Sequence, residues 1–237
     1  MIFAAGLGTR LRPLTDKIPK ALVLVAGKPL LEHIIEKLKN SGFDEIIVNV
    51  HHFSEQIIDF LKVRNNFGIR IEISDESDFL LDTGGGIRKA AGFFVDNKPF
   101  LVHNVDILSN IDLQKLYSTH LKNNSLATLA VSDRISTRYF LFDENFRLQG
   151  WKNAQTGETR PERKVLSENL LPLAFSGIQV LSPQVFGLME NFPQKFSIID
   201  FYLQNLEKNL TGFVPNNFTI IDVGKPETLL QAEGFTI

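Results

Sequence analysis

The chain has 237 residues, of which 43% are hydrophobic and 22% are charged, as in a globular protein with a sizeable buried core. Its 25 lysines and arginines nearly balance its 27 aspartates and glutamates, which argues against a nucleic-acid-binding protein. The absence of cysteine excludes disulfides, thiolate catalysis and cysteine-ligated metals. Neither a signal peptide nor an apolar segment of membrane-spanning length is recognisable, so we expect a cytoplasmic protein without a membrane partner.

The first half of the sequence alternates strand patterns with helix patterns. Four apolar runs predict strands, at residues 1–5, 45–50, 69–73 and 100–105. Helical periodicity follows Pro29, Ser54 and Asp112, which are residue types typical of a helix start. Such alternation is typical of an α/β protein, and we expect a Rossmann-like, mostly parallel sheet flanked by helices.

The second half is less regular and predicts a smaller α+β lobe. Two strand-like segments flank Glu144-Asn145 and predict a hairpin, and residues 151–171 predict a polar loop beside a site. Further strands are expected at 173–181 and 218–223, and helices after Ser182-Pro183, Ser197 and Pro226. No linker or internal repeat divides the chain, which we interpret as a single domain, 1–237.

The stretch GLGTRLRPLTDKIPK, which begins at Gly6, combines glycine with positive charge. Glycines between a strand and a helix let backbone N–H groups turn toward an anion, and Arg10 and Lys20 add cationic donors for phosphate oxygens. These features predict a cradle for a polyphosphate, and the alternative is a tight turn with solvated charges. A dinucleotide-binding loop is disfavoured because Leu11 stands where its third glycine would be.

Three consecutive glycines, 84–86, follow an acidic segment, 75–82. Backbone without side chains would let a flat ring lie against the chain, where N–H and C=O groups recognise it. The alternative is a flexible turn before a helix that begins near Arg88.

Two aspartates follow apolar strand patterns at distant points of the chain. Asp106 follows FLVHNV, and Asp222 follows FTII. Ligands of open α/β sheets bind at the carboxyl ends of strands, and Mg2+ is commonly held by a few carboxylates together with phosphate oxygens. The pair could therefore hold a magnesium ion beside the glycine loop. Alternatively, each aspartate caps a turn or a helix with its side chain.

The longer stretch GLGTRLRPLTDKIPKALVLVAGKPLLEH resembles the signature of the nucleoside-diphosphate-sugar pyrophosphorylases, also called sugar-1-phosphate nucleotidyltransferases. The resemblance continues through VNVHHFSEQI, TGGGI, FLVHNVDIL, FSGIQVL and IIDVGKPETL. It implies the nucleotide-diphospho-sugar transferase fold, with a nucleotide-binding half, 1–132, and a sugar-binding half that closes over it, 133–237. It also implies a nucleoside triphosphate and a sugar 1-phosphate as substrates. The strand before Ala4 is shorter than is usual in the family.

The resemblance implies roles for individual residues. Catalytic roles fall on Arg10, Lys20, Asp106 and Lys152. The nucleotide would contact Ala4, Ala5, Gly6, Gly8, Thr9, Arg10, Thr83, Gly84 and Gly85. The sugar would contact Asn104, Lys152 and Gly177, and the catalytic Mg2+ would bind Asp106 and Asp222. Glu168 and Asn169, in the polar loop, are further candidates for a substrate contact.

The form of the triplet segment, Asp-Thr-Gly-Gly-Gly-Ile, most resembles uridylyltransferases that act on N-acetylmuramic acid 1-phosphate in cell wall recycling. We therefore expect Mg2+-dependent nucleotidyl transfer from UTP to that sugar phosphate, with release of pyrophosphate. Guanylyltransferases for mannose or heptose 1-phosphate have a similar segment, and a phosphocholine cytidylyltransferase is another alternative within the family. A non-catalytic nucleotide-binding regulator is the alternative outside it.

Two positions depart from the family pattern. Val105 stands where many relatives have glycine, and Trp151 stands where a sugar-binding glutamate is common. A single tryptophan is more often part of a core than a platform for a sugar, so we expect a structural role for Trp151. The sequence shows no hexapeptide-repeat tail, with which many relatives trimerise, and we expect a monomer or a small homo-oligomer.

Overall fold

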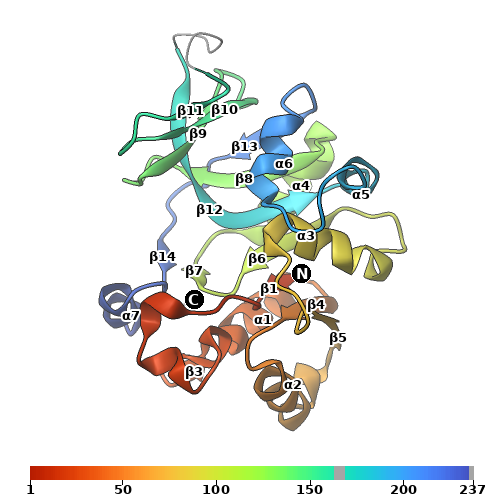
Figure 1. Ribbon diagram of the computed structural model, residues 1–237, viewed down its shortest axis with the longest axis vertical. Helices are drawn as coiled ribbons and strands as arrows, with labels where there is room; N and C mark the ends of the chain where they lie inside the picture. Colours follow the sequence, from red (N-terminus) through yellow and green to blue (C-terminus); the bar gives the residue numbers. More distant parts are fainter. Residues whose placement is uncertain (163–168, 235–237) are drawn as a thin grey trace.

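The computed structural model describes residues 1–162 and 169–234, and its centre is a ten-stranded mixed sheet (Figure 1). Along the sheet the strands follow the order β11-β10-β9-β12-β6-β1-β4-β5, and β12 also pairs with β8, which in turn pairs with β13. β12 is therefore the strand through which the two halves of the chain share one sheet.

The first half supplies four parallel strands: β1 (Ile2–Phe3), β4 (Glu45–Val50), β5 (Arg70–Asp75) and β6 (Phe100–Asn104). β1 lies between β4 and β6, and β5 lies beyond β4. The helices of this half are α1 (Leu30–Asn40), α2 (Ser54–Val63), α3 (Asp82–Lys89) and α4 (Leu113–Asn123). The predicted parallel sheet with flanking helices is confirmed for this half.

Apolar side chains cover both faces of the sheet. In β4, Ile46 and Val48 pack in a cluster with α1 and α2, whereas Ile47 packs in a second cluster with α3. This separation follows from the alternation of side chains along a strand. The second half contributes to both clusters, for example with Ile178 in the first and Phe201 in the second. The two halves therefore stabilise one another through a shared core.

The remaining strands of the sheet come mostly from the second half. β12 (Leu171–Leu181) pairs in antiparallel fashion with β6 and with β8 (Ala127–Ser132), and β13 (Leu210–Phe213) lies beyond β8. The predicted hairpin is confirmed as β9 (Arg138–Phe142) and β10 (Leu148–Asn153), to which β11 (Thr159–Arg160) adds a short strand. The sequence analysis does not predict β8, because its residues are buried on both faces and show no alternation.

The end of the described chain returns to the first half. β14 (Ile220–Asp222) pairs in antiparallel fashion with β7 (Ile107–Ser109), which directly follows β6. α7 (Pro226–Ala232) then lies beside the small hairpin of β2 (Leu24–Val25) and β3 (Lys28–Pro29) (Figure 1). A 3.0 Å hydrogen bond from the Ala26 N–H to the Glu233 carboxylate joins the two segments.

Shorter helices complete the described elements. α5 (Val185–Met189) and α6 (Ile198–Gln204) pack with α3. The 3₁₀ helices are η1 (Thr9–Leu11), η2 (Leu14–Asp16), η3 (Lys20–Leu22), η4 (Asn65–Gly68) and η5 (Ala90–Phe93). Across residues 1–162 and 169–234, no helix combines the length and the apolar character that a membrane span requires.

The helix starts predicted at Asp112, Ser197 and Pro226 are confirmed, and those predicted at Pro29 and Ser54 are shifted by one residue. The helix expected at Ser182-Pro183 begins at Val185. Pro29 belongs to β3 and flanks α1, and Ser54 is the first residue of α2 rather than its cap. The flanking residue of α2 is Phe53, whose φ of 54° lies in the left-handed region. Asp112 caps α4 as predicted, because its carboxylate accepts a 2.8 Å hydrogen bond from the Lys115 N–H.

Candidate functional site

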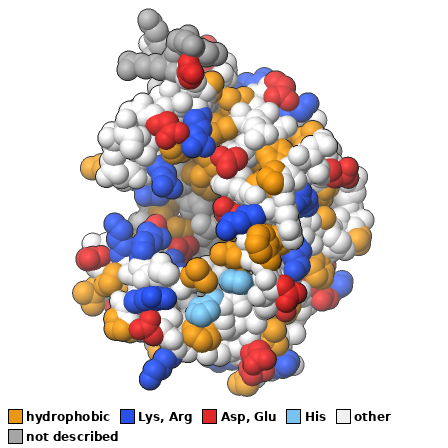
Figure 2. All heavy atoms as spheres, viewed as in Figure 1, with side chains coloured by type: hydrophobic (Ala, Val, Ile, Leu, Met, Phe, Trp, Pro, Cys, Tyr) orange, Lys and Arg blue, Asp and Glu red, His pale blue; other side chains and the backbone are white. Residues whose placement is uncertain are grey.

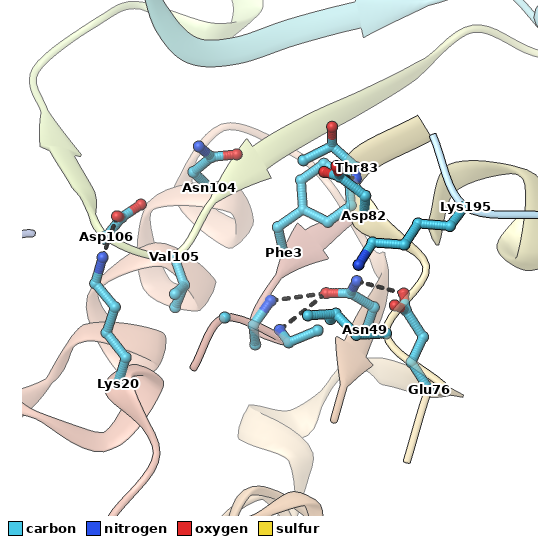
Figure 3. Close-up of a pocket in the computed structure, with 14 residues that line it drawn as sticks. Phe3, Lys20, Asn49, Glu76, Asp82, Thr83, Asn104, Val105, Asp106 and Lys195 are labelled. Carbon is cyan, nitrogen blue, oxygen red and sulfur yellow. Dashed lines mark hydrogen bonds and ion pairs between the residues drawn. The ribbon is translucent and has the colours of Figure 1, made fainter. Parts of the chain in front are cut away.

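A cavity of about 410 Å³ opens at the carboxyl ends of the parallel strands (Figure 3). One wall consists of residues 4–6 after β1 and 104–106 at the end of β6, and the other consists of residues from α3 and from the segment before α6. Among the predicted site residues, those that line the cavity are Ala4, Ala5, Gly6, Lys20, Thr83, Asn104 and Asp106. The cavity is therefore formed where the sequence predicts the nucleotide.

The glycine-rich loop has an open end and a fixed end. Around Gly6, no atom lies within 4 Å of the position that a Cβ would take, so a ligand can approach the backbone there. Gly8 has a φ of 65°, and its carbonyl accepts a 2.8 Å hydrogen bond from the Thr15 hydroxyl. A Cβ at Gly8 would also lie 2.9 Å from the Thr15 side chain. Gly8 therefore serves the fold of the loop, whereas Gly6 leaves its backbone accessible.

A buried amide holds the start of this loop in place (Figure 3). The Asn49 side-chain oxygen accepts hydrogen bonds from the N–H groups of Ala4, at 2.7 Å, and Ala5, at 3.3 Å. Its NH2 group donates to Glu76 at 2.7 Å, and Glu76 also accepts a hydrogen bond from the Leu81 N–H. Neither side chain was predicted from the sequence as part of the site. A polar residue inside the apolar run EIIVNV was the available signal.

The two predicted metal ligands come together. Asp222 lies opposite Ile107 in the β14–β7 pair, and the Val223 N–H donates a 2.8 Å hydrogen bond to the Asp106 carbonyl. Lys20 forms an ion pair with the Asp106 carboxylate (Figure 3). The predicted convergence of Asp106, Asp222 and Lys20 is confirmed, although 116 residues separate the two aspartates in the sequence (222 − 106).

The environment of Asp222 favours a bound cation. Burial raises the pKa of Asp222, and the negative charge of Asp106 raises it further, while Lys20, Arg10 and Arg134 lower it. One of its carboxylate oxygens, Oδ1, is buried and has no hydrogen-bond partner within the described residues. A buried carboxylate oxygen without a donor is a suitable ligand for Mg2+.

The described residues contain no cluster of three or more His, Cys, Asp and Glu side chains that could hold a metal ion by themselves. The residues present fit Mg2+ in the other mode, in which two carboxylates share the ion with phosphate oxygens and water. Arg10 lies close by, because a Cβ at Gly224 would stand 2.7 Å from its guanidinium and 2.6 Å from Asp222 Oδ1. A bound triphosphate would therefore meet positive charge and carboxylates in one place.

The glycine triplet is not a loop. All three glycines lie inside α3, which begins at Asp82, so the prediction of a loop before a helix near Arg88 is wrong. A Cβ at Gly84 would stand 2.3 Å from the Phe196 ring, and a Cβ at Gly85 would stand 2.6 Å from the Gln194 carbonyl. The glycines let the segment before α6 lie directly on α3.

The backbone of the triplet is also occupied. The N–H groups of Gly84 and Gly85 both donate to the Phe196 carbonyl, at 2.9 and 3.2 Å, and the Ile198 N–H donates to the Thr83 hydroxyl. The N–H groups of Gly84 and Gly85 are therefore not free to recognise a flat ring. Thr83 lines the cavity together with Asp82 and Lys195, which the sequence analysis did not select, and Figure 3 shows Lys195 extending into the cavity.

The predicted sugar-side residues fall into two groups. Asn104 and Gly177 are neighbours, because a Cβ at Gly177 would lie 2.7 Å from the Asn104 amide nitrogen. Lys152 lies on β10, with its ammonium 5.5 Å from the Tyr139 ring centre, and among the described residues it forms no hydrogen bond or ion pair with Asp106 or Asp222. Trp151 is buried in the core, which confirms its structural role. Of the two loop candidates, Glu168 lies outside the described residues.

In Figure 2 the molecule is hollowed between its upper and lower parts, and Lys and Arg side chains gather on both rims of the hollow. The upper part carries the β9–β10 hairpin and the lower part carries the glycine-rich loop (Figure 1). An anionic ligand between the two parts would therefore meet positive charge from both sides.

The fold and the paired aspartates define an α/β protein with a cavity at the carboxyl edge of its parallel strands. The sequence model of the nucleotidyl transferase family matches residues 1–236. The chain belongs to this family, and specifically to its sugar-1-phosphate nucleotidyltransferases.

Curated relatives support this membership. The chain is 36% identical to the N-acetylmuramate α-1-phosphate uridylyltransferase of Neisseria meningitidis over 197 residues, which cover 80% of the chain and 78% of that protein. It is 29% identical to the UTP–glucose-1-phosphate uridylyltransferase of Synechocystis over 248 residues, which cover 98% of the chain and 61% of that protein. The mannose-1-phosphate guanyltransferase of Saccharomyces cerevisiae is 28% identical over 235 residues, which cover 98% of the chain and 62% of that protein.

Solved structures share the fold. The HddC protein of Yersinia pseudotuberculosis, complexed with GMP-PN, matches with a TM-score of 0.78 at 26% identity. The match covers 98% of this chain and 96% of the HddC chain. A putative glucose-1-phosphate thymidylyltransferase from Bacillus anthracis matches with a TM-score of 0.81 at 18% identity. This match covers 100% of this chain and 95% of the Bacillus chain. The predicted nucleotide-diphospho-sugar transferase fold is confirmed.

Proposed function

We propose that the chain transfers a uridylyl group from UTP to N-acetylmuramic acid 1-phosphate and releases pyrophosphate, in a reaction that depends on Mg2+. One observation carries the proposal: Asp106 and Asp222, far apart in the sequence, meet beside Lys20 and the open glycine-rich loop. This arrangement suits a reaction that must hold two anionic substrates together.

In this proposal the two ends of the site have different tasks. The backbone at Ala5 and Gly6, with Arg10 and Lys20, holds the triphosphate and neutralises the pyrophosphate that leaves. Lys152 approaches the acceptor phosphate from the β9–β10 hairpin. The acceptor phosphate is ionised at neutral pH and attacks the α-phosphorus in line, so the chain needs no general base. Lys20 is released from Asp106 when phosphate oxygens provide it with new partners.

Asp106 and Asp222 would hold the magnesium ion. When bound, Mg2+ supplies positive charge that stabilises the charge developing on the transferred phosphoryl group. Asn104 and Gly177 would contact the sugar, and Thr83 would contact the nucleotide from the opposite wall of the cavity. Because the N–H groups of Gly84 and Gly85 are already bonded, contact of the triplet with the base would use Thr83 and the edge of α3.

The choice of substrate rests on two supports. The segment from Asp82 to Ile87 resembles the N-acetylmuramic acid-specific enzymes, and relatives with that name include the Neisseria protein at 36% identity. A guanylyltransferase for mannose or heptose 1-phosphate is the second candidate, since several relatives carry the mannose name and HddC holds GMP-PN.

A substrate panel tests the proposal. Purified protein is incubated with UTP, GTP, CTP or dTTP and with the 1-phosphates of N-acetylmuramic acid, glucose, mannose and heptose, or with phosphocholine, and pyrophosphate release is measured. We expect the highest kcat/KM for UTP with N-acetylmuramic acid 1-phosphate, and loss of activity with a chelator that added Mg2+ restores. Preference for GTP would select the second candidate. Binding without turnover for every pair would indicate a non-catalytic regulator.

The proposal includes the setting in which the protein works. We expect a cytoplasmic monomer or small homo-oligomer that has no nucleic-acid or membrane partner. Size-exclusion chromatography with light scattering measures the oligomeric state directly, with and without UTP.

A further inference from the structure

Most of the buried polar atoms without hydrogen-bond partners belong to residues at β8, β12 and β14 or directly next to them. Six side-chain atoms of the described residues have this property, and four of them belong to Ser132, Arg134, Ser176 and Asp222. Buried polar groups are nearly always satisfied in a folded protein, so an unsatisfied group calls for a physical reason. Four such groups on segments that the strand pairing and the charge interactions connect call for a shared explanation.

The pairing of strands brings these residues together. Ser132, at the end of β8, lies opposite Ala174, and Arg134 donates a 3.0 Å hydrogen bond from its guanidinium to the Phe175 carbonyl, next to Ser176. The register of β12 against β8 shifts between Phe175 and Gln179, and Ser176 lies within this irregular segment.

The same place adjoins the β14–β7 pair. A Cβ at Gly177 would lie 3.2 Å from the Ile107 side chain, and Ile107 pairs with Asp222. Alternation along β8 puts Ser132 on the face of Ala130, which packs in the same core cluster as Ile107. The positive charge of Arg134 also reaches Asp222, whose pKa it lowers.

Arg134 does not act as a simple counter-ion. Within the described residues it forms no ion pair, and its Nε–H is buried and has no acceptor. Ser132 and Ser176 are 2% and 1% exposed, so water does not satisfy their hydroxyls from the surface. A guanidinium N–H and two hydroxyls that lack acceptors form a donor set that suits an anionic oxyacid group.

We propose that Arg134, with the Ser132 and Ser176 hydroxyls, binds an anionic group of the acceptor substrate. This inference rests on the proposed function, which supplies two candidate groups: the phosphate of any sugar 1-phosphate, and the lactyl carboxylate that N-acetylmuramic acid carries and other hexoses lack. In either case Arg134 contacts the acceptor substrate, and binding of the nucleotide does not depend on it. A contact with the carboxylate would also determine the specificity for the sugar.

The test compares Arg134→Gln and Arg134→Lys with Arg147→Gln, a matched control at an exposed arginine of the β9–β10 turn. Calorimetry measures the Kd of N-acetylmuramic acid 1-phosphate, N-acetylglucosamine 1-phosphate and mannose 1-phosphate, and separately the Kd of UTP. Steady-state KM values are measured for the same ligands. Thermal unfolding checks that each variant is folded.

We expect Arg134→Gln to raise the acceptor Kd and KM about ten- to 100-fold and to leave UTP binding unchanged. Arg134→Lys should fall between Arg134→Gln and the wild type, because it keeps the charge but loses the planar donor fork. Weakening of all three sugar phosphates would assign the phosphate, and weakening of N-acetylmuramic acid 1-phosphate alone would assign the carboxylate.

Three outcomes would overturn the inference: unchanged acceptor binding in Arg134→Gln, an equal effect on UTP, or wild-type protein that binds none of the three sugar phosphates. Failure of the proposed function looks different. In that case the wild type turns over no substrate pair, while calorimetry still reports whether acceptor binding depends on Arg134.

Discussion

The two glycine-rich segments of this chain resemble each other in sequence and differ in what their glycines do. Around Gly6 the space is open, and Gly6 lines the same cavity as Lys20 and Asp106. In the triplet 84–86, by contrast, a Cβ added at any of the three glycines would lie within 2.6 Å of another group. The open loop lets a ligand approach the backbone, whereas the triplet lets the segment before α6 pack closely against α3.

The difference shows that a run of glycines does not by itself indicate a ligand site. A missing side chain permits close approach, and the approaching group can be a phosphate or a neighbouring segment of the same chain. The triplet is in contact with Phe196, Gln194 and Glu76, all of them protein groups. Substitutions should therefore affect substrate binding and catalysis at the loop around Gly6, and stability at the triplet 84–86.

The largest effect is expected at the charged end of the open loop. Asp106→Ala should lower kcat by about 100- to 1,000-fold, because it removes one of two carboxylates that hold the metal. Asp106→Asn keeps the shape and should lose comparable activity. Circular dichroism and thermal unfolding should show folded protein for both variants. Asp59→Ala, at an exposed residue of α2, is the control, and retention of Mg2+-dependent activity in Asp106→Ala would contradict the metal assignment.

The next effect separates the two glycine segments directly. Gly84→Ala should lower the free energy of unfolding by about 1–3 kcal/mol, because the new methyl group would stand 2.3 Å from the Phe196 ring. Gly6→Ala should change it by less than about 0.5 kcal/mol and should instead raise the KM for the nucleotide. Urea unfolding and initial rates measure the two quantities.

A double variant sharpens this test. Phe196→Ala removes the ring that the new methyl group meets, so Gly84→Ala should be less destabilising in that background, with a clear non-additive term. The comparison between the two segments fails if Gly84→Ala is as stable as the wild type and specifically weakens nucleotide binding.

A smaller effect is expected at the fixed end of the open loop. Thr15→Val leaves the Gly8 carbonyl without its 2.8 Å hydrogen bond and should destabilise the protein by about 1 kcal/mol. It should also raise the KM for the nucleotide, because Gly8 and Thr9 lose their anchor. Thr15→Ser keeps the hydroxyl and serves as the control. Equal nucleotide KM values for the valine and serine variants would show that this anchor does not matter for binding.

The smallest effect concerns the dependence of stability on pH. Because the folded-state pKa of Asp222 is raised, mainly by burial and then by Asp106, the folded protein holds this proton more tightly than the unfolded chain. Its ionisation therefore opposes folding, and this opposition sets in as the pH rises above the usual carboxyl range near 4. Asp222→Asn should have the higher Tm at pH 7 without Mg2+.

At a pH below the ordinary carboxyl pKa the two proteins should have the same Tm, because Asp222 is then neutral in both states. Added Mg2+ with UTP should stabilise the wild type more than Asp222→Asn. A variant that is less stable than the wild type at pH 7 would show that the Asp222 charge is already balanced by Lys20, Arg10 and Arg134.

Much of the fold could be predicted because its signals are local. The run EIIVNV predicts β4 with its observed bounds, and Asp112 predicts the cap of α4. The helix start at Ser54 is shifted because Phe53 takes a left-handed conformation that its residue type does not suggest. β8 was missed because a strand buried on both faces has no alternation to detect.

The site was only partly predictable. The family pattern located Asp106, Asp222 and Lys20, and the structure brings them together. Asn49 and Glu76 were not predicted as site residues, because a buried polar pair is recognised only once its hydrogen-bond partners are known. These partners are the N–H groups of Ala4 and Leu81. Arg134 was not predicted for the same reason, since only the packed structure shows that its buried Nε–H has no acceptor.

The sequence alone determined the elements of the parallel sheet, the cationic glycine-rich loop and the family, because periodicity, capping residues and motifs are encoded in neighbouring residues. Only the tertiary structure decided that the glycines of 84–86 pack against Phe196, that β14 carries Asp222 back to Asp106, and that four polar atoms near Arg134 lack partners. These features depend on groups that lie about 40 to more than 110 residues apart in the sequence, and the distance between such groups is set when the whole core packs.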